Sequence, residues 1–179
     1  MRGAAGLLGN AELIASIDWA QTPLGDAANW SPALRTVLQL VLENRFPMVF
    51  WWGPQLVQLY NDRYTPILGE KHPQSMGQSG QACWEEIWDV IGPQITSVYA
   101  GGPSTWNEDL LLDINRHGFV EETYFTFSYS ALPDPSAPGG IGGVLGTVQE
   151  TTEKVIGERR MRLLRDLAAR STEARTVED

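Results

Sequence analysis

The stretch FPMVFWWGPQLVQLYNDRYTPILG, residues 46–69, decides the fold of this chain. Met48–Trp52 and Leu56–Tyr60 are rich in aromatic and β-branched residues, and Gly53-Pro54 separates them. Two such runs around a turn predict a β-hairpin. Asn61 and Asp62 follow, and residues of this type initiate turns, so we expect a short helical piece after them. The stretch therefore predicts scaffold, the first hairpin of a sheet, and not a catalytic loop.

Composition and charge narrow the functional classes. The 179 residues predict one domain with appendages, and a formal net charge of -9 disfavours nucleic acid and anionic lipid as partners. No apolar run reaches the ~20 residues that cross a bilayer, and the N-terminus lacks the apolar core of a signal peptide. We therefore expect a cytoplasmic protein without membrane contact. The lone Cys83 excludes an internal disulfide, and with only two histidines a structural metal is not expected.

Two helices are predicted in the first hundred residues. In NWSPALRTVLQLVLENRFP, Ser31 is a typical N-cap, Pro32 a typical first helical residue, and Pro47 lies beyond the end. Leu34, Val37, Leu38 and Val41 would form its apolar face. In ACWEEIWDVIGPQITSVYAGG a helical period resumes, and we expect Gly92-Pro93 to break or kink it, with a second helix from Pro93 to Tyr99.

The remaining elements are strands and a last helix. A turn at Asn115–Gly118 precedes alternating residues from Thr123 to Ser130, which predicts two long antiparallel strands. IGGVLGTVQ predicts a final strand whose glycines allow something to approach its backbone closely. From Glu153 onward a charged amphipathic helix is expected, with a narrow apolar stripe suited to a partner helix: Ile156, Leu163, Leu164 and Leu167.

This order of elements resembles a PAS domain, and so do individual residues. Asn61, Gly69, Gly77, the RHG turn at 116–118 and ETT at 150–152 match the pattern of PAS sensor modules. ETT resembles the family's Asp-x-Thr junction, with Glu150 in place of Asp. The combination of TPLG, YNDRYTPILGEKHP, WEEIWDVIGP, EETYFTFSYS and ETTEKVIGERRMRLLRDLAAR is similar to the N-terminal PAS region of large bacterial sensor histidine kinases, including hybrid ones, in which a GAF module follows.

The resemblance implies an α+β PAS fold: a five-stranded antiparallel sheet with flanking short helices, an N-terminal helical extension and a C-terminal exit helix. It divides the chain into an extension with an amphipathic helix at 1–45, a PAS core at 46–152 and a signalling or linker helix at 153–179. It also implies a non-catalytic regulatory module that passes a signal through Glu150 and Thr152 to downstream GAF and kinase domains. The chain has no phosphoacceptor box and no ATP lid of its own.

The cofactor stays open, although two known cofactors of the family are disfavoured. Cys83 lies three residues beyond the position of the photoactive cysteine in the light-sensing LOV branch, and Val148 occupies the position of its flavin-contacting Gln. A haem would need a histidine on the helix beside the pocket, and that segment has none. His72 and His117 are predicted to be surface residues. No Ser-His-Asp arrangement or catalytic carboxylate pair emerges, so an enzyme is the weakest hypothesis.

Aromatic residues are in excess, and they either line a cavity or fill the core. The broader set is Trp51, Trp52, Tyr60, Trp84, Trp88, Trp106, Tyr124 and Phe125, with Asn61, Thr126 and Ser128 as polar groups among them. Our candidates for a ligand pocket are Trp52, Tyr60, Asn61, Trp88, Trp106, Phe125 and Phe127. The alternative is a filled core in a domain that serves only dimerisation. In either case we expect a homodimer through the N- and C-terminal helices.

Overall fold

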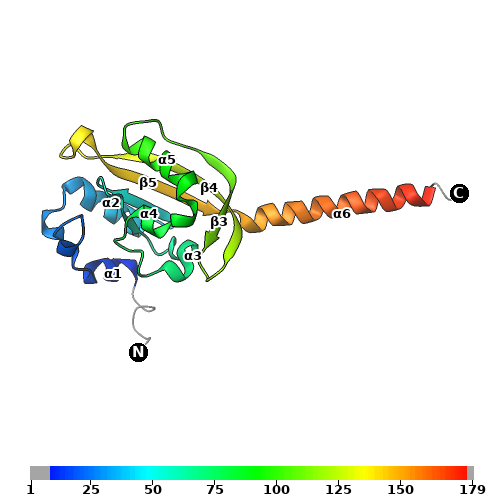
Figure 1. Ribbon diagram of the computed structural model, residues 1–179, viewed down its shortest axis with the longest axis horizontal. Helices are drawn as coiled ribbons and strands as arrows, with labels where there is room; N and C mark the ends of the chain where they lie inside the picture. Colours follow the sequence, from blue (N-terminus) through cyan, green and yellow to red (C-terminus); the bar gives the residue numbers. More distant parts are fainter. Residues whose placement is uncertain (1–8, 177–179) are drawn as a thin grey trace, which may run out of the picture.

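A computed structural model describes the backbone of residues 9–176 and the side chains of residues 9–170. Five antiparallel strands form one sheet in the order β2-β1-β5-β4-β3 (Figure 1). Their bounds are Met48–Trp52 (β1), Val57–Tyr60 (β2), Asn107–Asn115 (β3), Val120–Pro133 (β4) and Ile141–Glu150 (β5). The predicted first hairpin and the predicted five-stranded antiparallel sheet are both confirmed.

In the sequence between β2 and β3, the chain forms short helices, and these cover one face of the sheet. They are α3 (Thr65–Leu68), η3 (Gly69–Lys71), α4 (Gly80–Cys83), η4 (Glu85–Ile87) and α5 (Trp88–Tyr99). The N-terminal extension contributes α1 (Asn10–Ser16), η1 (Trp19–Gln21), η2 (Ala27–Asn29) and α2 (Pro32–Glu43). A further turn, η5 (Pro138–Gly140), precedes β5, and α6 (Thr152–Thr176) ends the described chain. The sheet is thus flanked by helices as the PAS resemblance implies.

Helix α2 forms as its sequence predicts. The Ser31 hydroxyl accepts a hydrogen bond from the Leu34 N–H at 3.1 Å and donates one to Asp134 at 2.6 Å, so the cap also ties the helix to the loop before β5. Leu34 and Val41 are buried, and α2 contacts β1 and β2. Each fully buried side chain of this size stabilises the fold by about 1.5–3 kcal/mol. The extension therefore shares the hydrophobic core of the sheet.

Helix α5 corrects one prediction. It runs unbroken from Trp88 to Tyr99 through Pro93, where we expected the helix to end. Proline removes one hydrogen bond within the helix. Ile91, Ile95 and Val98 share one face and are buried in the core, and this burial offsets the lost bond.

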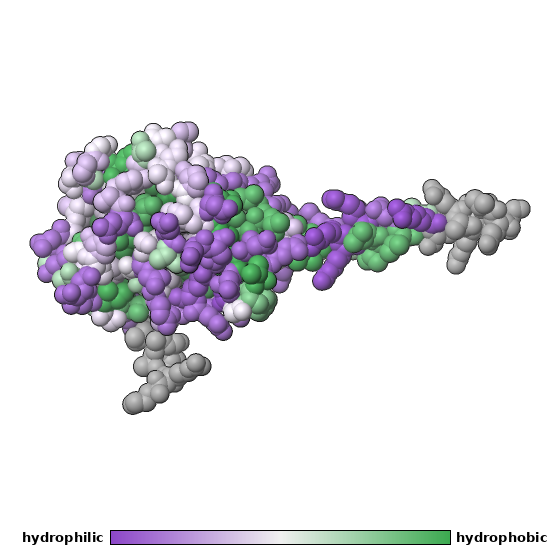
Figure 2. Space-filling model, in the orientation of Figure 1, coloured by the Kyte–Doolittle hydropathy of each residue, from purple (hydrophilic) through white to green (hydrophobic). Residues whose placement is uncertain are grey.

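Helix α6 leaves the sheet directly after β5 and extends away from the rest of the molecule (Figure 1). Only its first turns contact the domain: Lys154 pairs with Asp109 of β3 at 2.9 Å, and Arg159 pairs with Glu122 of β4 at 2.8 Å. Beyond them Figure 2 shows apolar residues along one side of the projecting helix and polar residues along the other. The helix is therefore tied to the sheet at its base and extends away from it beyond (Figure 1).

Candidate functional site: an interior cavity and a polar joint

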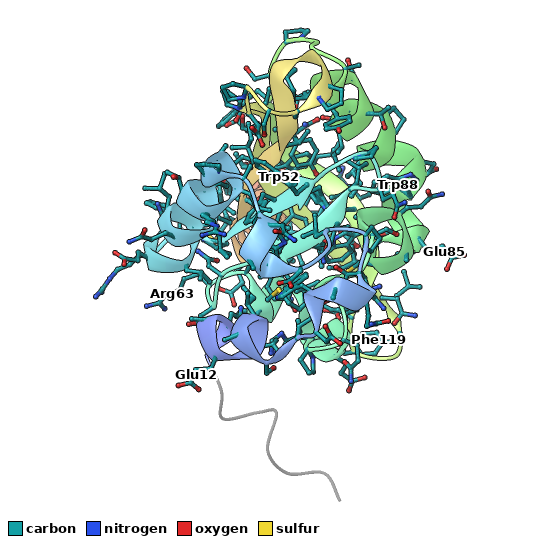
Figure 3. All side chains as sticks on the ribbon, turned by 90° about the vertical axis from the view of Figure 1, so that its left-hand side faces the viewer. Glu12, Trp52, Arg63, Glu85, Trp88 and Phe119 are labelled. Carbon is teal, nitrogen blue, oxygen red and sulfur yellow. The ribbon has the colours of Figure 1, made fainter. Side chains whose placement is uncertain are left out.

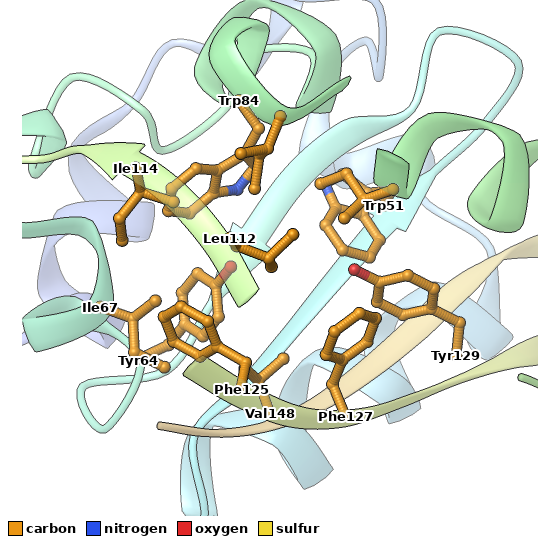
Figure 4. A pocket seen from close by; sticks show the side chains of 12 residues that line it. Trp51, Tyr64, Ile67, Trp84, Leu112, Ile114, Phe125, Phe127, Tyr129 and Val148 are labelled. Atoms are coloured by element: carbon orange, nitrogen blue, oxygen red, sulfur yellow. The ribbon is translucent and has the colours of Figure 1, made fainter. Parts of the chain in front are cut away.

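A small cavity lies between the sheet and the short helices (Figure 4). The centre of a water-sized sphere can occupy about 30 Å³ of it, so it has room for a few water-sized groups. Twelve buried side chains line it: Trp51, Tyr64, Ile67, Trp84, Ile87, Ile91, Leu112, Ile114, Phe125, Phe127, Tyr129 and Val148. The interior is thus neither completely filled nor large.

Three polar groups face this apolar space. The hydroxyls of Tyr64 and Tyr129 and the indole nitrogen of Trp84 lie on the cavity side of their rings (Figure 4). The Trp84 N–H is buried and has no hydrogen-bond partner in the described chain. The Tyr129 hydroxyl makes no hydrogen bond to a described residue, and the Tyr64 hydroxyl lies close enough to the Trp84 indole to interact with it; the two side chains are only 3% and 4% exposed. Buried polar groups are normally paired, so this cluster marks the cavity as unusual.

The two tyrosines remain protonated. Burial raises the pKa of Tyr129 far above its ordinary value. Burial also raises the pKa of Tyr64, the neighbouring Tyr129 and Cys83 add to the rise, and the nearby Trp84 indole opposes it. That indole is close enough to influence Tyr64, although the pair does not have hydrogen-bond geometry. The cavity therefore presents O–H and N–H groups, and none of the three carries a charge near neutral pH.

Among the predicted pocket residues, Phe125 and Phe127 of β4 line the cavity. The predicted polar groups Thr126 and Ser128 do not, because side chains alternate along a strand and these two lie on the opposite face. The Thr126 hydroxyl instead accepts a hydrogen bond from the Asp109 N–H at 3.1 Å. The polar groups of the cavity thus come from other elements than expected.

Three more candidates, Trp52, Tyr60 and Asn61, are buried but lie outside the cavity. Trp52 occupies the sheet face opposite to Trp51, and its ring covers Gly142 so closely that a Cβ there would collide with it. The Tyr60 hydroxyl bonds to His72 at 2.9 Å and to Ser75. His72, predicted at the surface, is therefore partly buried behind Tyr60.

The Asn61 side chain joins separate segments of the backbone through hydrogen bonds. Its amide oxygen accepts hydrogen bonds from the N–H groups of Met48 and Tyr64, both at 3.1 Å, which confirms that it caps the turn into α3. Its amide nitrogen donates to the carbonyls of Val41, Asn44 and Phe46. These bonds use the whole side chain to join α2, β1 and α3, and none reaches the cavity.

Two tryptophans lie away from the cavity altogether. Trp106 is 68% exposed at the start of β3. Trp88 lies on the flank of the domain (Figure 3), where its indole packs over Gly92 of its own helix. The cavity instead uses Tyr64 and Tyr129, which were not among our candidates. Tyr129 shares the alternation of Phe125 and Phe127, so the strand pattern contained the signal that identifies it.

A polar joint connects the sheet to α6, and we define it as Arg116, Glu150 and Thr152. The Arg116 guanidinium donates two parallel hydrogen bonds to the Glu150 carboxylate, each 2.8 Å long. The Thr152 hydroxyl donates to Glu150 at 3.0 Å and accepts from the Tyr124 N–H at 3.0 Å. The start of α6 is therefore tied to the β3–β4 turn and to β4.

Charge pairing within the joint is visible in its pKa values. Burial alone would raise the pKa of Glu150, but the hydrogen bonds and charge of Arg116 and the Thr152 hydroxyl hold it below its ordinary value. The pKa of Arg116 is raised, mainly by the hydrogen bonds to Glu150 and against the effect of burial. Both side chains are charged throughout the neutral range, and paired forks of this kind are among the strong, geometrically specific interactions of proteins.

The cavity and the joint share their strands. Ile114 precedes Arg116 by two residues, Val148 precedes Glu150 by two, and Phe125 is the cross-strand partner of Glu150. Ile114, Val148 and Phe125 all line the cavity. The lining of the cavity and the residues that hold α6 therefore adjoin each other on the same strands.

The cavity does not fit the large cofactors of light or gas sensing. It is far smaller than the roughly 300 Å³ at which pockets for larger ligands begin. Cys83 is buried but does not line it, and burial raises the pKa of its thiol to about 11. No histidine lines it either. Within the described residues no cluster of three or more His, Cys, Asp or Glu could hold a metal, and no helix is long and apolar enough to cross a bilayer.

Comparison with known proteins places the fold. No family model matches this sequence, and no curated protein is similar to it. An RNA-binding light-oxygen-voltage (LOV) receptor of known structure has 13% identity and a TM-score of 0.51 over 96% of this chain, which spans 42% of that receptor. A Rhodobacter sphaeroides LOV protein (14% identity, TM-score 0.49, 76% of this chain, 80% of that one) and the PAS domain of Bordetella pertussis BvgS (16%, 0.44, 74% and 97%) are also similar. The chain has the PAS fold.

Proposed function

We propose that this chain is a regulatory PAS module of a bacterial signal-transduction histidine kinase. A small ligand or partner alters the packing around the cavity, and α6 carries the change to a downstream GAF or kinase domain. The observation that supports this most is the placement of Ile114, Phe125 and Val148, which line the cavity and adjoin the joint. Within the joint, the charged fork ties the end of β5 to the β3–β4 turn, and the Thr152 hydroxyl links this fork to the start of α6.

The physical requirement for a switch is an element with two arrangements whose balance a ligand can shift. Helix α6 meets this requirement in part, because past its first turns it extends away from the domain while its base depends on a few polar contacts. A change at Arg116 or Glu150 would alter the contacts that set the direction and stability of the helix. The chain itself supplies no catalytic group to this process.

The test is a measurement of kinase output in the protein that carries this chain. Glu150→Gln keeps the shape but removes the charge that Arg116 holds, and Thr152→Val removes the hydroxyl. We expect each variant to alter autophosphorylation from ATP or its response to stimulus, whereas the exposed Glu158→Gln on the same helix should not. Output and response identical to wild type in both joint variants would contradict transmission through the joint.

Pairing between two copies is a second candidate role, and one observation favours it. Met161, Leu163 and Leu164 of α6 are each more than half exposed, at 52%, 57% and 60%. Such an apolar side on a projecting helix is suited to a second copy of the same helix. Sedimentation velocity should show a dimer that Leu163→Lys converts to monomer; a monomer at all concentrations in the wild type would rule this role out.

A further inference from the structure

We propose that the interior cavity is a receptor site for a compact, uncharged molecule that has an apolar body and a hydrogen-bond acceptor. The Trp84 indole N–H and the Tyr64 and Tyr129 hydroxyls would hold the acceptor. This inference rests on the proposed sensory function and specifies the chemical class of the ligand. A single-ring ketone is a representative of that class.

The lining excludes a charged ligand. Apart from the three groups named above, its only polar side-chain atom is the Trp51 N–H, which already donates to Gln58 at 3.1 Å. No charged side chain lines the cavity to balance an ion. An ion moved from water into such a space loses its hydration without compensation. The ligand is therefore neutral.

The lining also selects for an acceptor. Indole N–H groups donate and never accept, and the Trp84 N–H is buried at 2% exposure without a partner in the described chain. The two tyrosine hydroxyls stay protonated because burial raises the pKa of each. No carbonyl-bearing or carboxylate side chain lines the cavity. A ligand oxygen or nitrogen lone pair would satisfy groups that the protein itself leaves unpaired.

The size of the cavity limits the ligand to a small body. About 30 Å³ is open to the centre of a water-sized sphere, which excludes a flavin or a haem. A molecule seated there would touch Ile114, Phe125 and Val148, which adjoin the joint. The assigned ligand is thus placed where its presence changes the packing beneath Arg116 and Glu150.

A pair of probes of the same shape tests the assignment. In cyclopentanone the ring carries C=O, and in methylenecyclopentane it carries C=CH₂, so only the first has a good acceptor. Each is titrated into the ¹⁵N-labelled chain while the tryptophan indole N–H and backbone resonances are followed. We expect cyclopentanone to shift the Trp84 indole resonance saturably and to bind at least about fivefold more tightly than its analogue. Equal affinity of the two probes, or no saturable shift with either, would overturn the assignment.

Donor-deletion variants test two of the three contacts, those of Tyr64 and Trp84. Tyr64→Phe and Trp84→Phe each remove one donor and keep an aromatic ring, and each should weaken cyclopentanone by about 3- to 10-fold without weakening methylenecyclopentane. Trp106→Phe deletes an exposed indole and should change neither affinity. Equal weakening of both probes would show that the variants only disturb packing. If a variant fails to fold, the comparison of the two probes on the wild-type chain still decides.

The outcomes also separate this inference from the proposed function. Cyclopentanone binding that leaves the amide resonances of residues 150–153 unshifted would keep the receptor site and contradict transmission to α6. Changed kinase output in Glu150→Gln, with no binding of either probe, would keep transmission and overturn the receptor site.

Discussion

The cavity and the joint lie on the same strands, yet the side chains of the cavity are mostly apolar and those of the joint are mostly charged. The cavity is lined mostly by apolar side chains, and the buried Trp84 N–H that faces it has no partner among the described residues. The joint is compact and charged, and the Glu150 carboxylate is held by both Arg116 and Thr152. The first region is under-satisfied and easily changed, while the second is held by several specific bonds. The two regions therefore differ in how completely their polar groups are paired, and the proposed function assigns sensing to the first and transmission to the second.

The largest expected effect is at the joint. Arg116→Ala leaves the partly buried Glu150 and Glu121 carboxylates without their partner, and a charge left unpaired away from water is strongly unfavourable. We expect the free energy of unfolding to fall by about 2–3 kcal/mol in urea denaturation. Arg63→Ala, at an exposed arginine (Figure 3), should change it by less than about 0.5 kcal/mol. A loss in Arg116→Ala no larger than in Arg63→Ala would remove the distinction between the two regions.

At the cavity we expect a substitution that raises the free energy of unfolding, which is opposite in sign to the effect at the joint. Tyr129→Phe removes a buried hydroxyl that has no described partner and preserves the ring, so we expect a gain of about 1 kcal/mol in thermal or urea unfolding. Tyr60→Phe is the matched control, because that hydroxyl bonds to His72 and Ser75 and its removal should cost about 1 kcal/mol. Equal losses in both variants would mean that the Tyr129 hydroxyl is satisfied in solution.

A smaller loss is expected for the hydroxyl of Thr152. Thr152→Val keeps the shape but removes the bonds to Glu150 and to the Tyr124 N–H, and should cost about 0.5–1 kcal/mol. The change should appear mostly as faster amide exchange at the start of α6, and little at the cavity. Exchange that rises equally around Trp84 would show that the two regions unfold as one unit.

The smallest effect is a pH dependence. Folding lowers the pKa of Glu150 below its ordinary value, so its stabilisation is complete above the pKa of an unfolded glutamate and is lost as the pH falls through the folded pKa. Arg116, Glu121 and His117 surround this carboxylate. The difference in unfolding free energy between wild type and Glu150→Gln should therefore be largest at pH 6–7 and shrink toward pH 3. A constant difference across this range would show that the fork does not form in solution.

Part of this arrangement could be predicted from the sequence, because the signals are local. Residues close in the chain determine four of its features: the first hairpin, the cap at Ser31, the turn that Asn61 caps and the alternation along β4. The cavity depends on which face each strand buries. Both faces of β1 are covered, so its run of aromatic residues carries no period that could assign Trp51 to the cavity and Trp52 to the other side.

Of the three residues of the joint, only Glu150 and Thr152 could be predicted from the sequence. Glu150 and Thr152 stand in a recognisable motif, whereas the partner Arg116 lies 34 residues away and meets Glu150 only because the β3–β4 turn folds back beside the end of β5. The unbroken helix at Pro93 has a similar cause, since burial of Ile91, Ile95 and Val98 outweighs a local preference. Contacts between distant segments, rather than propensities, decide the parts that were missed.

The central claim is that a change in side-chain packing at the cavity changes the contacts of the joint. Its most direct test is amide hydrogen exchange in Val148→Ile, which adds one methylene to the cavity lining, against Val98→Ile, which adds the same group to a buried site outside the cavity. The Thr151 amide, which donates to Tyr124 at 2.7 Å, and the Val155 amide report the base of α6. We predict that exchange at both amides changes in Val148→Ile and not in Val98→Ile. Unchanged exchange in Val148→Ile, or the same change in both variants, would contradict the coupling.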